Sequence, residues 1–154
     1  MEQKTKINAE AGRQDLQITR EFDLPVELLF KAYAEPELVE QWMGTKVLKL
    51  ESKQHGSYRF QTSYEGNVVF QANGVIHEFN PNKQITRTFE MENTPFEVWL
   101  EFLEFEQLTS DTSKLNMHLV FRTIAQREQM LQMPFAEGIN RAHDRLQEIV
   151  IKLK

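Results

Sequence analysis

The chain has 154 residues, a formal net charge of −5 and no cysteine. Its length fits one domain with a single core, and its 40% apolar and 27% charged residues are typical of a soluble globular protein. The lack of cysteine excludes disulfides, thiolate nucleophiles and cysteine-ligated metal sites. The negative charge and scattered basic residues argue against nucleic acid or an anionic membrane as partners.

The N-terminal segment, residues 1–14, is polar, and we expect it to be flexible. It has no apolar run, so neither a signal peptide nor membrane insertion is expected, and the predicted location is the cytoplasm. Residues 15–154 are expected to form a single domain. That domain starts with a half-buried strand, because Leu16, Ile18 and Phe22 alternate with polar residues. Arg20 is the one charged residue on the inward phase of this strand.

Two short helices are predicted after the first strand. The first begins near Pro25 and ends before Glu35-Pro36, since a proline disfavours the helical conformation in the residue before it. One face of this helix is apolar at helical spacing, through Val26, Leu29, Phe30 and Tyr33. The second helix leads to Trp42 and ends at Gly44.

From Thr45 to Arg122 the apolar period changes to two, which predicts an antiparallel meander and brings the total to six or seven strands. Glu65-Gly66-Asn67 is expected to form a tight turn, and Gly74 a bulge or sharp bend. The apolar phase slips after Phe102, which predicts a second bulge there. This interpretation places Glu97 and Glu101 on a solvated face of the sheet.

The C-terminal stretch from Pro134 to Leu153 predicts a long helix with one continuous apolar stripe. The stripe consists of Phe135, Ile139, Ala142, Leu146, Ile149, Val150 and Leu153. A short helical turn is expected before it, within residues 123–132. The fold class is therefore α+β, with a curved antiparallel sheet wrapped around the long C-terminal helix.

Several local motifs resemble those of the helix-grip superfamily, also called START-like or SRPBCC. They are the run from Ile18 to Pro25, the run from Gln41 to Gly44, the set Gly74, Glu78 and Pro81, and the pair Glu137-Gly138. More narrowly, the chain resembles the bacterial branch related to the C-terminal domain of the activator of the 90-kDa heat-shock-protein ATPase. The resemblance implies a seven-stranded sheet gripping the C-terminal helix, with a cavity between them. Members of the superfamily bind lipids, hormones, polyketides or antibiotics, and some are cyclases or dehydratases.

A cavity in this fold would be lined by aromatic residues and a few polar groups. The predicted lining residues are Trp42, Tyr58, Phe60, Phe70, His77, Trp99, Phe135 and His143. If His77, His118 and His143 converged, they could bind a metal or act as an acid–base pair, but we favour separate structural roles. Glu78 is expected to make a structural hydrogen bond at the bend. We predict no catalytic residue, metal or cofactor, because the common catalytic motifs are absent.

Three functions remain open from the sequence. The favoured one is non-enzymatic binding of a small hydrophobic or amphipathic molecule in the cavity. The alternative is a protein-interaction module that contacts a chaperone and stimulates its ATPase, as in a stress response. The weaker alternative is a cyclase, dehydratase or hydrolase, which would require a group with a strongly shifted pKa inside the pocket.

Overall fold

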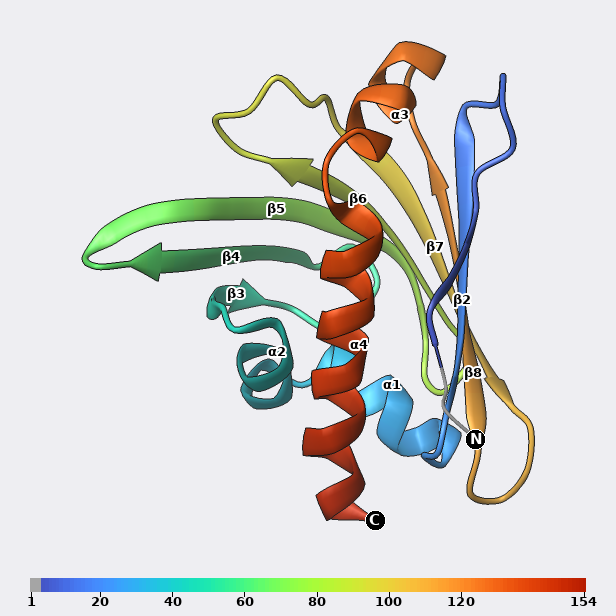
Figure 1. Ribbon diagram of the computed structural model, residues 1–154. Coiled ribbons are helices and arrows are strands. Elements are labelled where there is room, and N and C mark those ends of the chain that lie inside the picture. Colours follow the sequence, from blue (N-terminus) through green and yellow to red (C-terminus); the bar gives the residue numbers. More distant parts are fainter. Residues whose placement is uncertain (1–3) are drawn as a thin grey trace.

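A single curved antiparallel sheet wraps around one long helix in the computed structural model of this protein (Figure 1), which describes residues 4–154. The strands are β1 (Lys6–Asn8), β2 (Asp15–Phe22), β3 (Lys46–Leu50), β4 (Ser57–Tyr64), β5 (Asn67–Asn80), β6 (Gln84–Met91), β7 (Trp99–Gln107) and β8 (Ser113–Val120). The helices are α1 (Val26–Ala34), α2 (Pro36–Met43), α3 (Ile124–Leu131), α4 (Phe135–Val150) and the 3₁₀ turn η1 (Ile151–Leu153).

The sheet has the strand order β1-β2-β8-β7-β6-β5-β4-β3, and every neighbouring pair is antiparallel. The expected α+β helix-grip arrangement is confirmed, with eight strands rather than six or seven. The additional strand, β1, lies within the N-terminal segment and pairs with β2. Flexibility of residues 1–14 stays a prediction, and residues 1–3 lie outside the described part of the chain.

The helices lie together on the concave side of the sheet. In Figure 1, α4 crosses this side, with α3 at its N-terminal end and α1 and α2 beside its C-terminal half. Pro36 occupies the first position of α2, and Gly44 caps that helix with a φ of 64°, a conformation that glycine adopts without strain. The Thr123 side chain accepts a hydrogen bond from the backbone N–H of Gln126, which starts α3. These helix boundaries agree with the sequence analysis.

Strand β7 differs from its prediction. The register of β7 with both β6 and β8 is continuous, so the bulge expected near Phe102 is absent. The inward side chains are Trp99, Glu101, Leu103 and Phe105, and all four are buried. The apparent slip arose because a glutamate occupies an inward position, so the regular alternation looked broken. Glu101 is therefore buried, and its placement on a solvated face was wrong.

Strand β5 also differs in the position of its irregularity. The register of β5 with β6 shifts between Ile76 and Glu78 rather than at Gly74. A Cβ at Gly74 would collide with the Thr88 carbonyl oxygen and the Tyr58 ring, so glycine is needed there for a close backbone approach. The tight turn before β5 is confirmed, with φ of 51° at Glu65 and 81° at Gly66.

Buried arginines join the helices to the sheet. Arg20, the inward charge of β2, forms an ion pair of 2.7 Å with Asp144 of α4. Arg127 of α3 donates to the backbone oxygens of Glu10 and Asp15 at 2.6 and 2.8 Å. These contacts fix both ends of the helical layer relative to the N-terminal edge of the sheet. Among residues 4–154, no helix is long and apolar enough to span a membrane.

Candidate functional site

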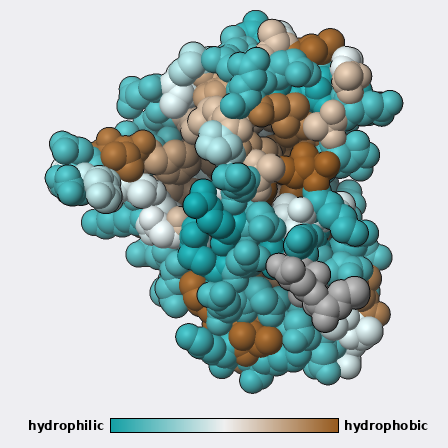
Figure 2. All heavy atoms as spheres, in the orientation of Figure 1, coloured by the Kyte–Doolittle hydropathy of each residue, from teal (hydrophilic) through white to brown (hydrophobic). Residues whose placement is uncertain are grey.

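A cavity of about 490 Å³ lies between the concave face of the sheet and the N-terminal half of α4. Apolar side chains from the sheet, α2, α3 and α4 make up most of its wall. They include Trp42, Phe70, Phe89, Trp99, Leu119, Phe135 and Ile139, together with Met43, Met91, Met117, Met130 and Met133. Figure 2 shows apolar side chains gathered in the same upper part of the molecule, around α3 and the start of α4.

The methionines give the wall an unusual character. Five of the six methionines of the chain line the cavity, and the sixth is Met1, which lies outside the described residues. Methionine has three rotatable bonds and a polarisable sulfur, so it adapts to ligands of different shape. Such a wall suits a binding site better than a rigid core, where branched side chains with fewer rotamers are favoured.

Small residues on α4 leave the space open. Gly138 and Ala142 line the cavity one turn apart, and a Cβ added at Gly138 would have no atom within 4 Å. Gly138 and Met133 are exposed, so the cavity meets solvent near the start of α4. The helix therefore closes one side of the cavity without filling it.

One ion pair stands on the sheet side of the cavity. Arg87 of β6 and Glu101 of β7 are direct cross-strand partners, and both point inward. They are 6% and 4% exposed, and Arg87 Nε donates to Glu101 Oε2 at 3.4 Å. Adjacent positions on one face of an antiparallel pair bring side chains together in this way. The cavity is thus largely apolar but contains one buried pair of opposite charges.

Aromatic rings surround the guanidinium group of Arg87. Its Cζ lies 5.0 Å from the centroid of Tyr58, 5.9 Å from that of Tyr33 and 6.0 Å from that of Phe89. Cation–π attraction from these rings partly offsets the loss of hydration. Burial raises the pKa of Tyr33 and of Tyr58, so both phenols are neutral at physiological pH. Beside them, the Trp99 ring stacks on Phe89 at 4.8 Å between centroids.

A buried histidine lies behind this wall. His143 of α4 has no exposed surface, and its Nδ1 is 2.8 Å from Thr5 Oγ1, while Nε2 is 3.4 Å from the Tyr33 hydroxyl. Burial lowers the pKa of His143 to about 3, and the nearby Arg20 charge lowers it further, with partial opposition from Asp144. The imidazole is therefore neutral at physiological pH and joins α4 to α1 and the N-terminal segment.

The predicted lining residues divide into three groups. Trp42, Phe70, Trp99 and Phe135 line the cavity. Tyr58 and Phe60 are buried in the core, and His143 is buried beside Tyr33, but none of the three reaches the cavity wall. His77 requires a correction: it is exposed, because it follows the buried Ile76 and so shares the outer face of the exposed Val75. That any of these residues binds a ligand stays a prediction.

The candidate acid–base residues do not converge. His118 lies on the outer face of the sheet and pairs with Asp15 at 2.8 Å, whereas His143 is on the inner side. Glu78 accepts hydrogen bonds of 2.9 Å from Thr86 and Gln84, so its expected structural role is confirmed. No group of three or more metal-ligating side chains is present within residues 4–154.

Sequence reasoning missed the polar residues of the cavity. Arg87, Glu101 and Arg145 all line it, and none was predicted there. A signal existed for the first two, because Arg87 is in phase with Ile85 and Phe89, and Glu101 with Trp99 and Leu103. Charged residues at inward positions of a strand are often functional, since burying them is costly.

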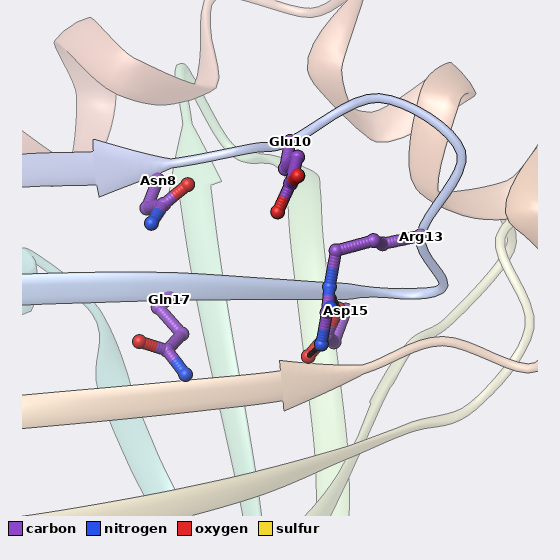
Figure 3. A pocket seen from close by; sticks show the side chains of 5 residues that line it. All are labelled: Asn8, Glu10, Arg13, Asp15 and Gln17. Carbon is purple, nitrogen blue, oxygen red and sulfur yellow. Dashed lines mark hydrogen bonds and ion pairs between the residues drawn. The ribbon is translucent and has the colours of Figure 1, made fainter.

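A second hollow is polar and smaller. It has a volume of about 200 Å³ and lies between β1 and β2 (Figure 3), lined by Asn8, Glu10, Arg13, Asp15 and Gln17. Arg13 and Asp15 satisfy each other through two hydrogen bonds of 2.7 and 3.0 Å. Since its main charges are already paired, this hollow offers a ligand less than the apolar cavity does.

Replacing Gly138 with alanine tests whether the space beside this residue is free of other atoms. Alanine is favoured over glycine in a helix by about 1 kcal/mol, and no atom obstructs the added methyl group. We expect Gly138→Ala to raise the free energy of unfolding by about 0.5–1 kcal/mol in urea titrations. Gly44→Ala is the control, since the positive φ at Gly44 should make that substitution destabilising. A loss of stability in Gly138→Ala would contradict the open space at this position.

The sheet, the gripped helix and the cavity between them define a START-like helix-grip protein. The family model described as "Activator of Hsp90 ATPase homolog 1-like protein" matches residues 23–150, and the chain belongs to this family. A search of curated proteins found no match.

Solved structures share the fold at low sequence identity. A Rhodobacter sphaeroides protein is 18% identical with a TM-score of 0.86, over 97% of this chain and 99% of the other. Protein Ms6760 from Mycobacterium smegmatis is 18% identical with a TM-score of 0.83, over 95% and 96%. An HSP90 activator from Plasmodium falciparum is 15% identical with a TM-score of 0.59, over 82% and 93%.

Proposed function

We propose that this protein binds a small amphipathic molecule in the cavity between the sheet and α4. The observation that carries the proposal is the cavity itself, about 490 Å³ of space with mostly apolar walls and a few polar groups. Small-molecule sites in proteins have volumes of about 300–1,000 Å³ and this same composition. The methionine-rich wall and the small residues of α4 support binding over tight packing.

Filling the cavity tests the proposal. Nile red, an uncharged dye that fluoresces in apolar surroundings, is titrated into the protein and into Ala142→Trp, which places a large ring in the cavity. We expect the wild-type protein to bind the dye and Ala142→Trp to bind it at least about tenfold more weakly, because the space is occupied. Ala136→Trp is the matched control, since Ala136 is an exposed residue of α4 outside the cavity. Equal binding by all three proteins, or none by the wild type, would overturn the proposal.

The family supports a second candidate function, stimulation of an Hsp90-type ATPase through a protein contact. Its support is the family description and the fold shared with the Plasmodium falciparum activator. Steady-state ATP hydrolysis by the chaperone, measured with and without this protein, tests it. A rise in rate that persists in Ala142→Trp would favour this candidate and separate it from cavity binding.

Location of this protein in the cytoplasm remains a prediction.

A further inference from the structure

Three polar groups on the cavity wall are left with unused hydrogen-bonding capacity. Among residues 4–154, the only hydrogen bond of the Arg87 side chain is the one from Nε to Glu101 Oε2, so both Nη groups lack a protein acceptor. Glu101 Oε1 likewise lacks a donor within this range. The indole Nε1 of Trp99, on the same wall, is buried without a partner among the described residues.

This arrangement differs from a structural ion pair. Buried charges are stabilising only when further hydrogen bonds satisfy their remaining donors and acceptors. Arg87 and Glu101 share one long hydrogen bond, although a bidentate arginine–carboxylate pair would make two short ones. Both residues line the cavity, where a bound molecule can complete their remaining hydrogen bonds.

The charge balance restricts that molecule. Arg87 and Glu101 together carry no net charge, and the apolar wall around them gives little screening. The third charged lining residue, Arg145 of α4, is exposed, and its Nε donates to the Trp42 backbone oxygen at 3.0 Å. An anionic group placed on Arg87 would lie beside the Glu101 carboxylate, and a cationic group on Glu101 would lie beside the guanidinium. Either ligand would also lose its own hydration on entry. An uncharged group with a donor next to an acceptor avoids the repulsion, and it loses much less hydration free energy than an ion does.

From these contacts we infer that the ligand is an uncharged amphipathic molecule whose polar end carries an adjacent donor and acceptor, the acceptor bound by Arg87 and the donor by Glu101. Primary amides and hydroxy-carbonyl groups have this pattern. The apolar body of the ligand would extend toward the methionines and α4. The inference rests on the proposed function and names the ligand class for that same cavity.

A series of probes with one chain and different polar ends tests the inference. The probes are octanamide, methyl octanoate, octanoate and octylammonium, titrated at neutral pH. Binding is followed by NMR of protein labelled with ¹³C at the methionine methyl groups, because five methionines line the cavity and report on its occupation directly. We expect octanamide to bind at least about tenfold more tightly than each of the other three, since only it satisfies both Arg87 and Glu101.

Glu101→Gln provides the second measurement. The substitution removes the negative charge and leaves the positive charge of Arg87 in place. We expect the ratio of octanoate to octanamide affinity to increase by at least about tenfold in this variant, because the repulsion of the anion is lost. If Glu101→Gln does not fold, the series on the wild-type protein decides the question by itself.

The outcomes separate the inference from the proposed function. Equal binding of the four probes, or a preference for octanoate or octylammonium, would overturn the uncharged ligand class while leaving a cavity that binds small molecules. If no probe shifted any methionine signal, and Nile red also failed to bind, both proposals would fall. Preference for octanamide, reduced in Glu101→Gln, would support both.

Discussion

Replacing Arg87 with methionine is expected to lower the free energy of unfolding by about 3–5 kcal/mol, the usual effect of removing one partner of a buried ion pair. Glu101 would keep a buried carboxylate without its counter-charge, and methionine would supply no donor. Replacing both residues, as Arg87→Met with Glu101→Leu, should recover much of this loss, since no uncompensated charge remains. Urea unfolding of the wild type, the two single variants and the double variant gives the coupling free energy directly.

The control is an ion pair at the surface. Arg59 of β4 pairs at 2.9 Å with Glu92, which lies in the turn after β6, and the Arg59 side chain is 48% exposed. Solvent screens such pairs, so Arg59→Met should lower the free energy of unfolding by less than about 1 kcal/mol. Similar losses for Arg87→Met and Arg59→Met would show that the cavity pair is well hydrated and would contradict its burial.

The sequence was sufficient to predict the fold because its local signals agree with one another. The apolar stripe of α4 and the Pro36 and Gly44 boundaries of α2 each specify an element independently of tertiary contacts. Strand β1 was missed for a physical reason. It has three residues, two of them exposed, and exists through its pairing with β2. No periodic pattern can be recognised over so short a length.

The polar part of the site could not be predicted in the same way. Period-two reasoning assigns charged residues to the solvated face, and Glu101 breaks that rule because Arg87 lies opposite it on the neighbouring strand. The partner is fourteen residues away in sequence, and the β6–β7 register was not known. His77 shows the opposite error. It was grouped with Val75 and Phe79, but Val75 is itself exposed. The register shift between Ile76 and Glu78 then separates the outer face of His77 from the face of Phe79, which packs against the core.

Acidification is expected to destabilise the protein through His143. The histidine of the unfolded chain binds a proton below about pH 6.5, whereas burial keeps the pKa of folded His143 near 3. Between these values the unfolded state binds more protons, so this residue makes stability fall as the pH decreases. The contribution is about 1.4 kcal/mol for each pH unit inside the window and disappears above it. The charged neighbours are Arg20 of β2, which opposes protonation, and Asp144 of α4, which favours it.

A non-titrating variant isolates this contribution from the carboxylates that also titrate in acid. In His143→Asn the shorter amide can still bond Thr5, which lies 2.8 Å from Nδ1 in the native protein, but it takes up no proton. We expect the variant to be less stable at pH 7, because contacts with Phe22 and Tyr33 are lost. Between pH 6 and 4, however, its urea midpoint should fall less steeply than that of the wild type. The difference should correspond to about one fewer proton taken up on unfolding. Parallel midpoint curves for the two proteins would mean that His143 takes up a proton in the folded state. Its contacts with Thr5 and Tyr33 would then be made by a charged imidazolium.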